Sequence, residues 1–204
     1  ERLRGLPAAG DRRNAASSAG VGLAVATGIE GVLRIDPVVH GDERGFFMES
    51  WNARRFAEVG IDADFTQDNH SRSAQWVLRG LHYQAGAAAQ GKLVRVTRGE
   101  VFDVAVDLRR SSPTFGRWYG EILSEHNHRQ LWIPPGCAHG FLVLSEFADF
   151  QYKCTGRYRP ETERTLRWDC ETLGVEWPLD GNPPVLSAKD RDGGRSIGEC
   201  ELFE

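Results

Sequence analysis

The residues best suited to chemistry lie in the segment Leu78-Arg79-Gly80-Leu81-His82-Tyr83-Gln84. His82 is the natural general base, because imidazole has an ordinary pKa of about 6.5. Arg79 lies three residues earlier, so the two side chains would face opposite sides of a strand. A bend at Gly80 would re-aim one of them. We therefore predict that Arg79 and His82 serve one site; the alternative for His82 is a structural strand histidine.

A cation follows ten residues after this histidine. Lys92 opens the alternating stretch Gly91–Val96, which is typical of a strand, and it is one of only three lysines among 25 basic side chains. A lysine partly shielded from water can stabilise a developing oxyanion. We predict that His82 and Lys92 are the base and the cation of one active site, although Lys92 could also be a charge at a strand edge.

Other candidate residues are more ambiguous. Tyr152 suits either the core or an acid catalyst. Arg44 and the pair Phe46-Phe47 suit a phosphate and a planar base, or a solvated charge beside core aromatics. His126 and His128 stand in a turn-like segment and are expected at the surface.

The same histidine could instead belong to a metal site of the His-x-His type. The sequence reads His82-x-Gln84, no carboxylate follows at the usual distance, and only His139 stands where a last ligand would be. Half of the ligand set is missing. We therefore predict no metal, and the sequence contains no motif for an organic cofactor.

Length, composition and charge indicate which class of protein carries these residues. A length of 204 residues suits one domain, and 40% hydrophobic with 26% charged residues is ordinary for a globular protein. A net charge of -4 gives no reason to expect binding to nucleic acid or to an anionic membrane. No apolar run approaches the length of a transmembrane span. Four scattered cysteines indicate reduced thiols and a cytoplasmic protein. They are Cys137, Cys154, Cys170 and Cys200.

The chain divides at about residue 29. Residues 1–28 are rich in Arg, Ala, Ser and Gly, and we expect a flexible N-terminal extension there, with an organellar transit peptide as the alternative. Residues 29–204 form the predicted domain. Asn52–Val59 is predicted as a helix and the segment from Asp180 as largely loop, apart from a definite Leu186–Asp190.

The rest of the domain has the short strands and regular turn signals of an all-β sandwich or barrel. The predicted strands are Gly31–Pro37, Phe46–Trp51, Val77–Gln84, Lys92–Arg98, Val101–Leu108, Trp118–Leu123, Arg129–Ile133, Gly140–Leu144 and Phe150–Thr155.

Eight motifs occur in order along the domain. They are Gly41–Glu49, Asn69-His70-Ser71, Val77–Gln84, Gln90–Val96, Ser112–Gly116, Trp132–Phe141, Tyr152–Thr155 and Leu186–Asp190. Through these motifs the chain from about Ile29 to Asp190 resembles the dTDP-4-dehydrorhamnose 3,5-epimerase family.

The resemblance implies a cupin-type jelly roll (a double-stranded β-helix) with a few short helices. It also implies a homodimer with strand exchange and catalysis without metal or cofactor. The implied reaction epimerises dTDP-4-dehydro-6-deoxy-D-glucose at C3 and C5, giving dTDP-4-dehydro-L-rhamnose.

The resemblance also implies a role for each matching residue. In the family's pattern His82 is the base, Asp190 the carboxylate that orients it, Lys92 the cation for the enolate, and Tyr152 the acid. The residues implied to bind the substrate are Arg44, Phe47, Glu49, Gln67, Asn69, Arg79, His139 and Tyr158.

Three alternatives stay open. Ala87-Ala88 and Gly156-Arg157 depart from the family's usual residues near the substrate loops. The first alternative is therefore a mono-epimerase that acts at C3 or C5 alone in antibiotic sugar synthesis. A non-catalytic sugar-nucleotide-binding jelly roll would be expected to lack His82 or Tyr152, and both are present. A metal-dependent cupin oxygenase is disfavoured by Gln84.

Overall fold

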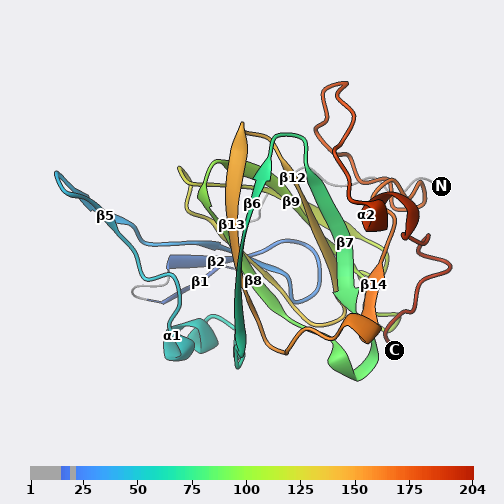
Figure 1. Cartoon of the computed structure of the whole chain (residues 1–204). Coiled ribbons are helices and arrows are strands. Elements are labelled where there is room, and N and C mark those ends of the chain that lie inside the picture. The colour runs from blue at the N-terminus through green and yellow to red at the C-terminus, as the bar shows by residue number, and fades with distance from the viewer. Residues whose placement is uncertain (1–14, 19–21) are drawn as a thin grey trace.

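The computed structural model describes residues 15–18 and 22–204, and its dominant feature is a pair of packed antiparallel sheets (Figure 1). The larger sheet has the order β1 (Ala15–Ser18), β2 (Gly22–Ala26), β3 (Leu33–Asp36), β11 (Gln130–Ile133), β8 (Lys92–Arg98), β13 (Phe147–Cys154), β6 (Gln67–Ala74). The smaller has the order β10 (Trp118–Ser124), β9 (Glu100–Asp107), β12 (Cys137–Val143), β7 (Leu78–Gln84), β14 (Glu163–Thr165). This arrangement confirms the predicted all-β jelly roll.

Helices are few and short. They are α1 (Ala53–Glu58), α2 (Ala188–Asp192) and the 3-10 turns η2 (Gly86–Ala88) and η3 (Pro160–Thr162). Helix α1 begins as predicted, because the Asn52 side chain accepts a hydrogen bond from the Arg55 amide. A separate hairpin of β4 (His40–Asp42) and β5 (Gly45–Phe47) projects from the body (Figure 1).

Alternating apolar residues place three cores on the sheets. In β9, Val101 and Ala105 face the inner core between the sheets, while Val104 and Val106 face outward. The outward face packs against residues from the segment 166–203, and the outer face of the larger sheet packs against Phe56 of α1. The C-terminal segment therefore covers apolar sheet surface.

Several predicted elements need correction. The strand predicted at Phe46–Trp51 ends at Phe47, and the tail predicted as largely loop contains α2, with Ser187 as its N-cap. Strand β6 was not predicted, because its sequence QDNHSRSA lacks apolar alternation. Among the described residues, no helix has the length and apolar character that crossing a membrane requires.

The segment predicted as a flexible extension, residues 1–28, is only partly described. Within it, β2 pairs with β3, and Ala24 is buried in the same cluster as Ile35. Residues 22–26 therefore belong to the sheet rather than to a free extension. Residues 1–14 and 19–21 lie outside the described part of the chain.

The predicted bend at Gly80 is present on β7. Gly80 has φ +132°, and a Cβ placed on it would lie 2.5 Å from the Cα of Gly140 in β12. The register between these strands shifts between His139 and Phe141. Only glycine fits a backbone with this φ and this close an approach.

We expect Gly80→Ala to lower the free energy of unfolding by about 3 kcal/mol, from about 1–2 for the left-handed backbone and about 1–3 for overpacking. Denaturant unfolding would measure the loss. Gly86→Ala is the matched control, because Gly86 also has a positive φ of 58° but no atom within 4 Å of its added Cβ. Equal losses in the two variants would contradict the close-approach argument.

Candidate active site

A cavity of about 610 Å³ opens between the two sheets, near α2. Its wall includes six of the predicted residues, drawn from β7, β8, β12, β13 and α2. They are Arg79, His82, Lys92, His139, Tyr152 and Asp190. Arg79 and His82 both line it, as the bend at Gly80 predicts, and the Arg79 Nε donates to Ser73 Oγ at 3.0 Å.

His82 and Asp190 form a hydrogen-bonded pair across β7 and α2. His82 Nε2 and Asp190 Oδ1 are 2.5 Å apart, and Asp190 also accepts from Ser187 Oγ at 2.7 Å. Burial would raise the pKa of Asp190, but the hydrogen bonds from His82 and Ser187 outweigh it, so the carboxyl pKa is lowered. Asp190 is therefore an ionised acceptor held in a fixed position.

The imidazole of His82 is suited to act as a base. Burial lowers its pKa more than Asp190 raises it, so the ring is neutral at neutral pH. An ionised carboxylate can only accept, so Nε2 carries the hydrogen and Nδ1 has a free lone pair. A neutral, oriented imidazole with one free nitrogen can remove a proton from a bound molecule.

Lys92 and Tyr152 face the cavity from the opposite sheet. Lys92 lies on β8 and Tyr152 on β13, where Tyr152 pairs with Val94 in register. Burial lowers the pKa of the Lys92 ammonium and raises the pKa of the Tyr152 phenol. The phenol therefore keeps its proton at neutral pH. The cavity thus has an imidazole on one sheet and an amine and a phenol on the other.

His139 is held on the inner face of β12. Its Nε2 lies 2.8 Å from Oδ2 of the fully buried Asp103, and its ring stacks on Phe150 at 5.9 Å. The other carboxylate oxygen of Asp103 is buried without a hydrogen-bond partner among the described residues. The contacts with Asp103 and Phe150 fix the position of His139 in the cavity wall.

Three further predicted residues form one polar cluster. Gln67 donates to Asn69 Oδ1 at 2.9 Å along β6, and the Tyr158 amide donates to Gln67 Oε1 at 3.2 Å. Tyr158 is 48% exposed and its hydroxyl donates to Glu163 Oε2 at 3.1 Å, and Glu163 lines the cavity. This exposed ring beside amide groups suits a planar base.

Sequence reasoning missed an ion pair in the cavity wall. Lys189 Nζ lies 2.9 Å from Glu163 Oε1, and both residues line the cavity. Burial would raise the pKa of Glu163, but the hydrogen bond from Lys189 outweighs it and lowers the pKa. The scarcity of lysine was the signal that could have found Lys189, because two of the three lysines line this cavity.

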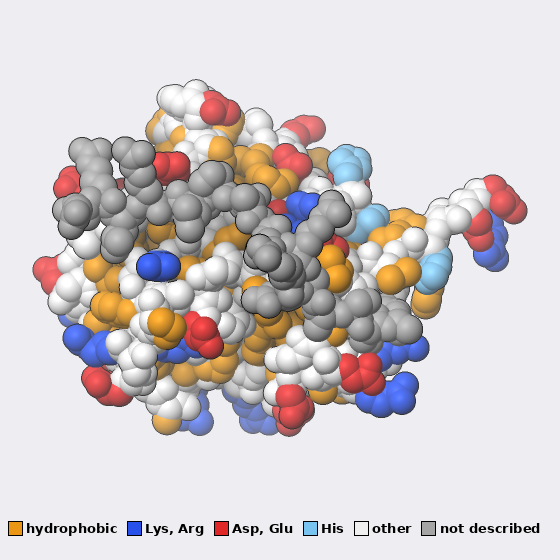
Figure 2. Space-filling model, turned by 180° about the vertical axis from the view of Figure 1, so that it is seen from behind, with side chains coloured by type: hydrophobic (Ala, Val, Ile, Leu, Met, Phe, Trp, Pro, Cys, Tyr) orange, Lys and Arg blue, Asp and Glu red, His pale blue; other side chains and the backbone are white. Residues whose placement is uncertain are grey.

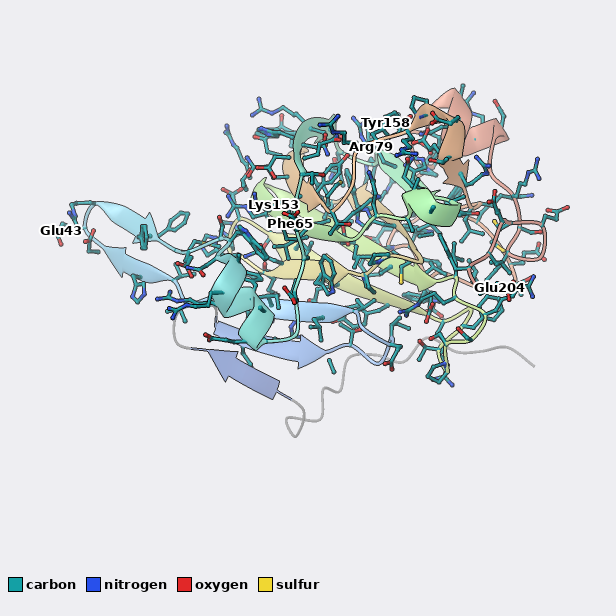
Figure 3. All side chains as sticks on the ribbon, turned by 90° about the horizontal axis from the view of Figure 1, so that it is seen from below. Glu43, Phe65, Arg79, Lys153, Tyr158 and Glu204 are labelled. Carbon is teal, nitrogen blue, oxygen red and sulfur yellow. The ribbon has the colours of Figure 1, made fainter. Side chains whose placement is uncertain are left out.

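Six of the predicted residues line this cavity, three form the polar cluster, and the last three lie at neither place. Arg44 and Phe47 lie on the β4–β5 hairpin, where the Phe47 residue is 71% exposed. Glu49 bonds instead to Asn52 and Arg55 near α1. Figure 3 shows Glu43, near the hairpin tip, well away from Arg79 and Tyr158.

The residue that replaces a metal ligand has another partner. Gln84 Oε1 accepts from the Arg159 amide at 2.8 Å and from Thr162 Oγ1 at 3.0 Å. Across residues 15–18 and 22–204, no three His, Cys, Asp or Glu side chains gather as a potential metal site.

Comparison with known proteins gives one consistent family. The family model described as dTDP-4-dehydrorhamnose 3,5-epimerase matches residues 26–195. A Pseudomonas aeruginosa protein of that name is 59% identical over 176 residues, which cover 86% of this chain and 96% of that relative.

Solved structures agree. The Legionella pneumophila dTDP-6-deoxy-D-glucose-3,5-epimerase in complex with dTDP-4-keto-L-rhamnose is 51% identical with a TM-score of 0.85, covering 89% of this chain and 97% of that one. A 3'-monoepimerase from Streptomyces bikiniensis, in complex with dTDP-quinovose, is 32% identical with a TM-score of 0.78, covering 84% and 86%. The chain belongs to the dTDP-4-dehydrorhamnose 3,5-epimerase family.

Proposed function

We propose that this chain epimerises dTDP-4-dehydro-6-deoxy-D-glucose at C3 and C5 to dTDP-4-dehydro-L-rhamnose. The observation that carries the proposal is the neutral, Asp190-bound His82 facing Lys92 and Tyr152 across one cavity. The 59% identity to a 3,5-epimerase, against 32% to a mono-epimerase, supports action at both carbons.

The C4 ketone makes this arrangement chemically sufficient. Each neighbouring C–H bond is acidified, because the electron pair left on carbon delocalises onto the ketone oxygen as an enolate. His82 Nδ1 takes the proton, and Lys92 stabilises the negative oxygen. Tyr152 then donates a proton to carbon from the opposite sheet, which inverts the configuration. Solvent restores the proton to Tyr152 and removes it from His82.

Cationic side chains would hold the diphosphate. Besides Lys92, the arginine and lysine side chains in the cavity wall are Arg79 and Lys189, and a local cluster can bind an anion although the whole chain has a net charge of -4. Gln67, Asn69 and Tyr158 would bind the nucleoside, and His139 would contact the sugar.

We propose further that the enzyme is a cytoplasmic homodimer with strand exchange. Arg44, Phe47 and Glu49 do not line the cavity of their own chain, so their binding role requires a second subunit. The exposed hairpin that carries the first two supports this arrangement. The four free cysteines support a reducing compartment.

Proton NMR of the 4-keto sugar nucleotide in deuterated water would test the proposed function. We expect deuterium at both C3 and C5 and formation of the L-lyxo product. Exchange at one carbon alone would favour a mono-epimerase, and binding without exchange a non-catalytic protein. Treatment with a chelator is expected to leave the rate unchanged, and a loss would revive the metal alternative.

The pH dependence of the reaction tests the pair of His82 and Asp190. The base must be neutral, so kcat/KM should fall on the acid side as pH drops below the lowered pKa of His82. Asp190 raises that pKa, so Asp190→Asn should move the acid limb to lower pH and reduce kcat by up to about 10⁴-fold through loss of the correct tautomer. A limb that stays in place or moves to higher pH would contradict the pairing.

A further inference from the structure

The β4–β5 hairpin leaves the body at two fixed roots. We call residues 37–49 the arm; Asp36 precedes it and Ser50 follows it. Asp36 Oδ1 accepts from Arg129 Nε at 3.0 Å, and the Ser50 carbonyl accepts from Gln130 Nε2 at 3.1 Å. Figure 2 shows the arm standing clear of the body, with charged side chains at its tip. Both roots are therefore held by neighbouring residues of β11 and the turn before it.

A third contact reaches the arm itself. The ring of His128 lies 4.6 Å from the ring of Phe46 at an interplanar angle of 40°. Phe46 is 62% exposed, so this ring contact is a specific feature of an otherwise open hairpin. Residues 128, 129 and 130 thus contact the arm and its two roots in succession.

The turn that presents these three residues is itself rigid. Asn127 Nδ2 donates to the Ile122 carbonyl at 2.8 Å, and Asn127 Oδ1 accepts from the Ser124 and Arg129 amides at 3.1 and 3.0 Å. Arg129 also pairs with Glu121, which is 7% exposed. His128 has a φ of +53°, so the turn fixes the backbone from which its ring projects.

We propose that His128 is a positioning residue that sets the direction of the arm and thereby the nucleotide affinity of the partner's active site. The inference rests on the proposed function, in which Arg44 and Phe47 act in the second subunit. All six strand residues of the hairpin are exposed in their own chain, and Glu49 at the base of the arm bonds to Asn52 and Arg55, so the ring of His128 is a contact to the strands themselves. Arg129 and Gln130 fix where the arm starts and ends, and His128 fixes its tilt.

The test begins with His128→Asn, because asparagine tolerates a positive φ and lacks the ring. Loss of an aromatic contact should raise KM for the sugar nucleotide, and Kd for thymidine diphosphate by calorimetry, by about 3- to 10-fold. The expected kcat stays within about twofold, as for loss of binding alone. His126→Asn is the matched control, because His126 is an exposed histidine of the same turn. Unchanged KM and Kd in His128→Asn would overturn the proposal.

Two further measurements distinguish an effect of His128 on the direction of the arm from an effect on the active site of its own subunit. In the double variant with Phe46→Leu the two losses should be less than additive, whereas independent effects would overturn the proposal. In a mixed dimer of His82→Ala with His128→Asn, the only working site belongs to the His128→Asn subunit and receives the intact arm. KM should return to the wild-type value, and a raised KM would overturn action in the partner. Failure of the proposed function would appear instead as an inactive wild type, and the calorimetric measurement of Kd would still test the role of His128.

Discussion

His82→Ala is expected to abolish deuterium incorporation at both C3 and C5 of the 4-keto sugar nucleotide. His82 is the only imidazole in the cavity wall that is paired to an ionised carboxylate of α2, and its free Nδ1 is the proposed base. General base catalysis by a positioned side chain contributes about 10²–10⁴-fold to the rate. We therefore expect the rate of deuterium incorporation to fall by about 10²–10⁴-fold, measured by NMR in deuterated water.

Binding should survive the same change. The nucleotide contacts proposed for Gln67, Asn69 and Tyr158 lie on other elements, so Kd for thymidine diphosphate should change by less than about threefold. His126→Ala is the matched control, because it removes an exposed imidazole that does not line the cavity. Retained exchange at either carbon in His82→Ala would assign the base for that carbon to another residue.

The sequence could predict most of the residues of the candidate site, because apolar and polar residues alternate in the inner strands. Lys92–Arg98 is a strand with the predicted bounds, and Gly80 bends β7 as a glycine beside His82 and Arg79 suggests. The helix cap at Asn52 follows from side-chain chemistry alone. These features depend on local periodicity and on backbone freedom, which a single sequence contains.

Other features depend on contacts between distant segments. Strand β6 is polar because it is an edge strand with Ser71 in the cavity wall, so hydrophobic periodicity cannot reveal it. The pair of Lys189 and Glu163 joins α2 to β14 across 26 residues. The contact of His128 with the arm joins two surface segments, and the sequence indicated only a surface histidine. Such pairings become visible only when the sheets are assembled.

The charge distribution inside the cavity follows from the same assembly. His82 is neutral because burial outweighs Asp190, so the base does not repel Lys92 in the resting site. The basic groups Arg79, Lys92 and Lys189 then outnumber the acids Asp190 and Glu163 in the wall, although the chain is acidic overall. A dianionic diphosphate and an enolate are both stabilised by this local positive potential. In the proposed mechanism, substrate binding and enolate formation therefore depend on the same cluster of basic side chains.

Tyr152→Phe is expected to separate proton removal from inversion. His82 on β7 remains able to take a proton and return a deuteron to the same face of the sugar, so the substrate should still gain deuterium with its configuration retained. Protonation from β13 loses its donor, so formation of the inverted product should fall by about 10²–10⁴-fold. NMR of recovered substrate and product gives the ratio of exchange to inversion.

Tyr119→Phe supplies the matched control for this ratio. Tyr119 is also a partly buried tyrosine packed against the inner core, but its hydroxyl bonds to Glu121 on β10 and does not line the cavity. Its removal should leave the ratio of exchange to inversion at the wild-type value. Inversion at the normal rate in Tyr152→Phe would make Tyr152 a packing residue and would require a donor elsewhere on the larger sheet. Since the base and the proposed acid lie on different sheets, a changed ratio would mean that the two-sheet architecture itself supplies the two faces that epimerisation needs.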